Sequence, residues 1–222
     1  MTCFMLKAVI FDMDGVLVDS EPIYYEIEKK NFRKLGLKIS EREHLSFKGM
    51  TGKGMWSLLK KKYGLPQPLN ELILSARKIT LERMAVEKNL KPILGVVPLL
   101  SALKRHGVKL LLATSASKEC MDLLLAVLKL GQYFEHKVCA ADVEHGKPAP
   151  DIFLAAAKRA GVHPMSCIVF EDSRNGVLAA KRAGMKCIGY DDSAIKQDLS
   201  SADLIIDSFD KINYRKLLQF CA

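Results

Sequence analysis

The stretch Ala8-Val9-Ile10-Phe11-Asp12-Met13-Asp14-Gly15 joins a short apolar run directly to two carboxylates and a glycine. A continuous apolar run of this length predicts a strand buried on both faces, the kind found inside a parallel sheet. In open α/β sheets, ligands bind just beyond the carboxyl ends of such strands. Asp12 and Asp14 therefore indicate a functional site, and Gly15 lets the backbone turn beside them.

Strand and helix patterns alternate along the chain from Pro92 onward. Further strands are expected over 109–114, 137–140, 167–170, 187–190 and 204–206. Helices are expected between and after them, over 96–106, 118–130, 150–160, 174–183 and 214–220. This alternation predicts right-handed crossovers and an α/β fold, a Rossmann-like parallel sheet flanked by helices.

The segment between the first strand and this alternating part is helical throughout. Helices are expected over 22–35, 51–63 and 69–89, with Ser20 as the N-cap of the first. No part of the segment alternates like a strand. The sequence therefore predicts an all-helical insertion over 19–91, placed within an α/β core made of residues 1–18 and 92–222.

The composition is that of a globular protein. Of 222 residues, 49% are hydrophobic and 27% are charged, and we expect neither a membrane span nor a signal peptide. The six cysteines are dispersed without a C-x-x-C pair, which argues against a zinc site or disulfides. Cys139, Cys167 and Cys187 are expected as small buried hydrophobes. We expect a monomer in the reducing cytoplasm.

Positive charge is concentrated in the helical insertion. The chain carries a net charge of +9, and residues 19–91 hold 16 basic and 9 acidic side chains. Solvated helix faces are one interpretation, and a positive lid over a site for an anionic substrate is another. A nucleic-acid partner is not expected, because no nucleic-acid-binding signature accompanies the charge.

Polar side chains follow four of the expected strands or lie in the loops beyond them. In chain order they are Asp12 and Asp14, Thr114 and Ser115, Lys147, and Glu171 and Asp172. Because the carboxyl ends of parallel strands meet at one edge of a sheet, we expect these groups to lie together. Singly, each has a commoner explanation as a helix cap or a turn residue. Their coincidence at successive strand ends favours a site.

The chemistry of this set is specific. Clustered carboxylates repel one another unless a cation neutralises them, and all-oxygen ligands suit Mg²⁺. A lysine and two hydroxyls match phosphate oxygens. One of the paired acids could attack phosphorus, while the other protonates the leaving oxygen and then activates water.

Four stretches of the sequence resemble a known family. They are FDMDGVLVDSEP (Phe11 to Pro22), LLLATSAS (Leu110 to Ser117), HGKPAPDIF (His145 to Phe153) and FEDSRNGVLAA (Phe170 to Ala180). In this order they resemble the haloacid dehalogenase-like superfamily. The resemblance is to its branch with a small helical cap, which includes β-phosphoglucomutase and many sugar-phosphate phosphatases.

The resemblance implies a role for each polar residue. Asp12 matches the nucleophile and Asp14 the general acid and base, and both match Mg²⁺ ligands, Asp14 through its backbone carbonyl. Lys147 matches the lysine that holds the phosphoryl group and orients the nucleophile. The other expected ligands are Thr114 and Ser115 for phosphate, and Glu171 and Asp172 for the metal.

The insertion resembles the cap that closes over substrate in this family, with residues 47–53 as its substrate-facing loop. The resemblance implies substrate contacts from Tyr24, Lys48, Gly49 and Lys53. Two positions depart from β-phosphoglucomutase, which has a histidine at Tyr24 and an arginine at Gly52. Because lysine and arginine differ in phosphate geometry, Lys53 does not simply replace that arginine.

These observations predict a Mg²⁺-dependent phosphatase that forms an aspartyl-phosphate. Its expected substrate is a small sugar, polyol or nucleoside phosphate. A sugar phosphomutase of the β-phosphoglucomutase type is one alternative. A non-catalytic protein that binds a phosphorylated metabolite is another.

Overall fold

The computed structural model describes residues 5–87, 89–191 and 197–221. Its centre is one sheet of six parallel strands in the order β3-β2-β1-β4-β5-β6. The strands are β1 (Ala8–Phe11), β2 (Lys109–Ala113), β3 (His136–Val138), β4 (Cys167–Glu171), β5 (Lys186–Tyr190) and β6 (Leu204–Ile206). The predicted Rossmann-like parallel sheet is therefore confirmed.

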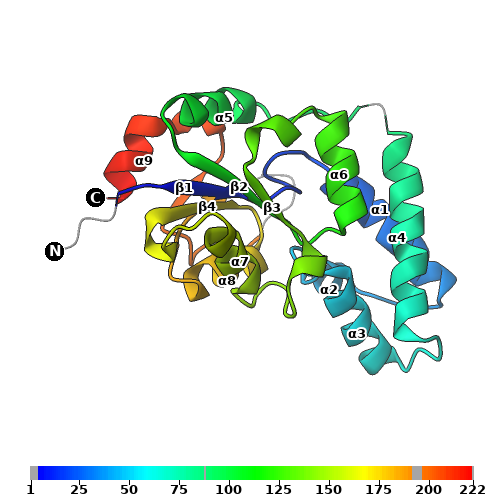
Figure 1. The fold of residues 1–222 in the computed structure, drawn as a ribbon. Helices are drawn as coiled ribbons and strands as arrows, with labels where there is room; N and C mark the ends of the chain where they lie inside the picture. Colours follow the sequence, from blue (N-terminus) through cyan, green and yellow to red (C-terminus); the bar gives the residue numbers. More distant parts are fainter. Residues whose placement is uncertain (1–4, 88, 192–196, 222) are drawn as a thin grey trace.

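Helices cover both faces of this sheet (Figure 1). On one face lie α5 (Val96–Arg105), α6 (Lys118–Val127) and α9 (Tyr214–Cys221). On the other lie α7 (Asp151–Arg159) and α8 (Arg174–Arg182). The two layers explain why the strand sequences are apolar without alternation, since both sides of each central strand are buried.

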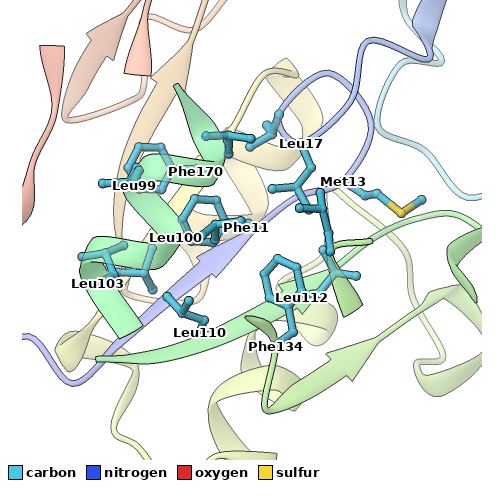
Figure 2. Close-up of a cluster of buried hydrophobic side chains, with 14 of the residues drawn as sticks. Phe11, Met13, Leu17, Leu99, Leu100, Leu103, Leu110, Leu112, Phe134 and Phe170 are labelled. Carbon is cyan, nitrogen blue, oxygen red and sulfur yellow. The ribbon is translucent and has the colours of Figure 1, made fainter. Parts of the chain in front are cut away.

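Strand β1 divides its side chains between the two apolar clusters. Val9 and Phe11 pack with the α5 side, whereas Ala8 and Ile10 pack with the α7 and α8 side. Figure 2 shows the first cluster, in which the Phe11 ring stacks on Phe170 of β4 with ring centroids 4.9 Å apart. The central position of β1 fixes the point from which Asp12 leaves the sheet.

Four helices follow β1 and precede α5 in the chain. In space they lie beyond the carboxyl ends of the strands (Figure 1). They are α1 (Glu21–Lys34), α2 (Glu41–Leu45), α3 (Gly52–Tyr63) and α4 (Leu69–Ala85). They share an apolar cluster of their own, which includes the buried side chains of Phe32, Trp56 and Leu72. We call residues 19–91 the helical insertion.

The two segments that connect the insertion to the sheet run side by side. Val18 forms an antiparallel bridge with Pro92, and the Ile93 N–H donates to the Leu17 carbonyl oxygen at 2.9 Å. The insertion therefore begins and ends at one place on the molecule.

Several sequence-based boundaries were wrong. The helix expected over 69–89 ends at Ala85, and the helix expected over 118–130 ends at Val127, because Lys129 adopts a positive φ of 56°. Helix α2, with five residues, is too short to show a helical period and was missed. Ser20 precedes α1, but its side chain makes no cap hydrogen bond, because its hydroxyl donates to Asp14 instead.

The expectation that three cysteines are buried is confirmed. Cys139, Cys167 and Cys187 are buried, as expected. Within the part of the chain that the structure describes, no helix is both long and apolar enough to cross a lipid bilayer.

Candidate active site

The carboxylates at the ends of β1 and β4 meet where the strand order reverses. Phe11 pairs with Phe170, and the Asp12 N–H donates to the Phe170 carbonyl oxygen at 3.0 Å. One carboxylate oxygen each from Asp12, Glu171 and Asp172 lies within 4.8 Å of the others. The predicted convergence of these three residues is observed.

Lys147 lies at the centre of this cluster and is 2% exposed. Its Nζ donates to Asp12 Oδ1 at 2.7 Å and also contacts Glu171 Oε1. Burial alone would lower the pKa of Lys147, but the carboxylates of Asp12 and Glu171 outweigh it and raise the pKa. The lysine therefore stays charged and fixes one oxygen of Asp12.

Glu171 is held by its own backbone turn. Its Oε2 accepts hydrogen bonds from the N–H groups of Asp172 and Ser173, both at 3.0 Å, and from the Ser173 hydroxyl at 2.9 Å. A Cβ at Gly176 would lie 1.9 Å from Glu171 Oε1, so a glycine is required there for close approach. The remaining oxygen of Glu171 faces Lys147.

Asp14 stands apart from the three-carboxylate cluster. Its Oδ1 accepts a hydrogen bond of 2.5 Å from the Ser20 hydroxyl. Burial raises the pKa of Asp14, although the hydrogen bond from Ser20 and the charge of Lys147 oppose the shift. A carboxyl whose pKa is raised can hold a proton nearer neutral pH, which suits a general acid and base.

The donor set fits a hard divalent cation. Asp172 Oδ2 is buried and has no well-directed hydrogen bond, although Lys48 Nζ from the insertion lies 2.6 Å away. Burial raises the pKa of Asp172 to about 8, although the neighbouring charge of Lys48 opposes the shift. Three buried carboxylates, one of them with an oxygen that accepts no hydrogen bond, match the ligands that Mg²⁺ prefers. The expected contact from the Asp14 carbonyl stays a prediction.

The two hydroxyls after β2 face the same cavity. Thr114 is 1% exposed, and its Oγ1 accepts a hydrogen bond from the Ala116 N–H at 3.0 Å. Ser115 Oγ donates to the Gly49 carbonyl oxygen of the insertion at 2.8 Å. The cap of α6 is Ser117, so the alternative that Thr114 or Ser115 caps this helix is wrong.

The observed N-cap of helix α8 also excludes the alternative that Asp172 caps this helix. Helix α8 is capped by Ser173, whose Oγ accepts from the Gly176 N–H at 3.0 Å. The Asp172 carboxylate takes no part in this cap, so it is available to a ligand.

A cavity of about 810 Å³ lies between the strand ends and the insertion. Asp12, Asp14, Thr114, Ser115, Lys147 and Asp172 line it from the core, and Tyr24, Lys48, Gly49 and Lys53 line it from the insertion. Lys48 is 8% exposed, whereas Lys53 is exposed to solvent. Burial raises the pKa of Tyr24. The structure therefore gathers the predicted residues of both parts around one cavity, with Glu171 directly behind it.

Several residues near the cavity could not be found from the sequence. Glu21 lines the cavity, and burial raises the pKa of its carboxyl to about 8. Asn175 of α8 donates to the carbonyl oxygens of Ser46 and Lys48 in the insertion, at 3.2 and 2.8 Å. Glu21 lies inside a quoted motif, but no sequence signal marks Asn175, because its partners are backbone atoms far away in the chain.

Comparison with known proteins agrees with this geometry. The model of a family described as haloacid dehalogenase-like hydrolase matches residues 9–190. The chain belongs to the haloacid dehalogenase-like hydrolases. It is an enzyme of the phosphatase type within this family.

Two curated relatives illustrate the family likeness, and one solved structure shows the same fold. The chain is 39% identical to YhcW of Bacillus subtilis (strain 168), which carries the name of a phosphatase, over 83% of each chain. It is 35% identical to the phosphorylated carbohydrates phosphatase of Thermotoga maritima, over 82% of this chain and 84% of the relative. The crystal structure of β-phosphoglucomutase from Clostridium difficile has the same fold, with a TM-score of 0.85 and 23% identity over 98% and 97% of the two chains.

Proposed function

We propose that this hydrolase is a Mg²⁺-dependent phosphatase that forms an aspartyl-phosphate on Asp12. Its proposed substrate is the phosphomonoester of a small sugar, polyol or nucleoside. The observation that carries the proposal is the arrangement around Asp12, in which Lys147 holds one carboxylate oxygen and Asp14 lies in the same cavity, held by Ser20.

The two aspartates divide the reaction between them. With Oδ1 held by Lys147, the other oxygen of Asp12 attacks phosphorus, and the bond from phosphorus to the leaving oxygen breaks. Asp14 gives its proton to that leaving oxygen. Asp14 then takes a proton from water, which attacks phosphorus and releases the Asp12 carboxylate together with inorganic phosphate.

The remaining site residues bind and neutralise charge. Asp12, Glu171, Asp172 and the Asp14 backbone carbonyl would hold Mg²⁺. The ion, when bound, offsets the negative charge shared by the carboxylates and the phosphoryl group. Thr114, Ser115 and Lys147 donate to the phosphoryl oxygens.

The insertion acts as a cap in this proposal, with residues 19–91 as one domain and residues 1–18 and 92–222 as the core. Lys48 and Gly49 lie against the catalytic edge, where Lys48 contacts Asp172 and Gly49 accepts from Ser115. Opening about the paired segments at Val18 and Pro92 would admit substrate and metal, and closure would exclude bulk water during the reaction.

Phosphate release tests the proposal directly. The wild-type protein should hydrolyse p-nitrophenyl phosphate and a panel of sugar and polyol monophosphates with Mg²⁺, and should lose this activity with a chelator. Asp12→Asn should lower kcat by about 1,000-fold or more, because the amide is a poor nucleophile. Thermal unfolding should show that Asp12→Asn remains folded.

The outcomes also separate the alternatives. Substantial turnover by Asp12→Asn would contradict the nucleophile assignment, and binding of sugar phosphates without any hydrolysis would favour a non-catalytic role. Conversion of a sugar 1-phosphate to its 6-phosphate, with catalytic bisphosphate added, would identify a phosphomutase.

A further inference from the structure

We infer that helix α1 carries a subsite for the hydroxyl groups of the leaving group, formed by Tyr25, Glu28 and Asn31. This inference rests on the proposed phosphatase function and deepens it. It makes the preferred substrate the monophosphate of a neutral, polyhydroxylated compound, and it disfavours a second phosphate at the far end of the cavity.

Asn31 is the first indication of such a subsite. It is 8% exposed and lines the cavity that also contains Asp12. Among the described residues, its side-chain amide has no hydrogen-bond partner. A side-chain amide that faces the cavity and has no protein partner can bind a ligand group that both accepts and donates a hydrogen bond. A hydroxyl group does both.

Glu28 lies three residues before Asn31, on the same face of α1, and also lines the cavity. Its Oε2 accepts a hydrogen bond of 2.7 Å from Nε2 of His44. The second carboxylate oxygen makes no hydrogen bond with any described residue. That oxygen can accept a hydrogen bond from a substrate hydroxyl without disturbing His44.

His44 holds Glu28 in place and does so from a rigid position. The histidine is 6% exposed, its ring stacks on Tyr25 with centroids 4.4 Å apart, and the edge contact with Phe32 has centroids 5.1 Å apart. Tyr25 lies three residues before Glu28, so its ring and phenol complete one polar strip along α1. A fixed acceptor loses little freedom when a ligand binds.

The charges around the cavity agree with a neutral leaving group. Two cations at its wall have partners of their own, since Arg77 pairs with Glu119 at 3.1 Å and Lys118 with Asp122 at 2.5 Å. Lys53 is exposed. A second phosphate near Glu28 would meet a carboxylate in a partly desolvated site, which is unfavourable.

The test compares two substrates in the full-length enzyme. Sorbitol 6-phosphate presents several hydroxyls, whereas p-nitrophenyl phosphate presents none. Asn31→Leu keeps the side-chain size and should lower kcat/KM for sorbitol 6-phosphate about tenfold, chiefly through KM. Activity on p-nitrophenyl phosphate should change less than about twofold. Asn70→Ala, an exposed asparagine of α4 on the same cavity, is the matched control and should leave both substrates unchanged.

A second variant tests the carboxylate. Glu28→Gln keeps an acceptor for His44 and removes the charge, so it should improve kcat/KM for a ketose bisphosphate relative to sorbitol 6-phosphate by about tenfold. Glu28→Gln still tests the proposed subsite if Asn31→Leu does not fold. The inference is overturned if folded Asn31→Leu lowers kcat/KM equally for sorbitol 6-phosphate and p-nitrophenyl phosphate. It is also overturned if the wild-type enzyme has a higher kcat/KM for the ketose bisphosphate than for sorbitol 6-phosphate. Hydrolysis of none of these esters would instead overturn the proposed function.

Discussion

The absence of a side chain at position 15 determines where Asp172 can lie. Gly15 has a φ of 79°, and a Cβ there would lie 1.8 Å from Asp172 Oδ2. The turn after Asp14 and the acid after β4 therefore occupy space that only a glycine leaves open. Gly15 thus belongs to the candidate metal site although it offers no ligand.

Gly36 offers a matched control for this close approach. It has a similar φ of 69°, but a Cβ there would meet nothing within 4 Å, so Gly36→Ala should cost only the left-handed backbone penalty of about 1–2 kcal/mol. Gly15→Ala should destabilise the protein further and should weaken Mg²⁺ binding about tenfold or more. Urea denaturation and titration calorimetry measure the two effects. Equal effects of both variants would show that Asp172 tolerates the displacement.

Residue types at strand ends could be predicted because topology alone brings them together. Asp12, Lys147 and Asp172 needed only the inference of a parallel sheet with known strand ends. The hydrogen bond from Ser20 to Asp14 could not be predicted, because Ser20 also suits a helix cap and only the folded turn decides between the two. The role inferred for the Asn31 amide could not be predicted either, because it depends on the amide having no hydrogen-bond partner among the described residues.

At the scale of elements, Asp203 joins α8, β5 and the segment that leads into β6. Its two carboxylate oxygens each accept from Lys181 Nζ at 2.6 Å, and Oδ2 also accepts from the Cys187 N–H at 2.8 Å. Partial burial favours the neutral acid, but these donors outweigh it and lower the pKa of Asp203. The ionised carboxylate of Asp203 therefore stabilises the packing of α8 and β5 against the segment before β6.

The sign of the pH dependence follows from that lowered pKa. The contribution of Asp203 should be complete above the ordinary aspartate pKa and should be lost as the pH falls through the lowered value. Asp203→Asn should reduce the free energy of unfolding at pH 7 by about 1 kcal/mol, because solvent screens the pair in part. Urea denaturation from pH 7 to pH 3 measures both quantities.

Asp207→Asn is the control for this prediction. Asp207 pairs with Lys211 at 2.6 Å on an exposed surface, and its removal should leave the unfolding midpoint unchanged within error. An Asp203→Asn variant with the same acid sensitivity as the wild type would contradict the assignment.

Apart from the short helix α2, element types were predictable from the sequence, but many of their ends were not. The strand over residues 204–206 and the apolar run of β1 are confirmed at both ends. Helix α6 stops early because Lys129 turns into a left-handed conformation that nothing in its residue type requires. Helix ends depend on such local competition between backbone conformations, which periodicity does not register.

At the scale of the whole molecule, backbone carbonyls of the insertion accept hydrogen bonds from side chains of the core. Asn175 donates to Ser46 and Lys48, and Gln197 donates to Leu45 over a longer distance of 3.4 Å. These contacts bring the loop over residues 45–49 against the carboxyl ends of the strands. These hydrogen bonds use backbone atoms of the loop, and the Lys48 side chain adds its contact with Asp172.

Removal of Asn175 should therefore loosen this docking. Asn175→Ala should raise KM several-fold for a sugar monophosphate, because two hydrogen bonds that position the loop are lost. Gln197→Ala, which removes only the long bond, should have a smaller effect. Steady-state kinetics supply the comparison, with thermal unfolding as the check on folding. A larger effect of Gln197→Ala would place the main attachment elsewhere.

The bridge between Val18 and Pro92 has a consequence for how such enzymes diversify. Because both ends of the helical segment leave the sheet at neighbouring points, a piece of different length or architecture can be accepted there with little added loop-closure entropy. In the proposed function the reacting groups belong to the strands, and the helical insertion that selects the leaving group is an exchangeable cassette. New specificities can arise by replacing that cassette, and the inherited chemistry continues to operate underneath.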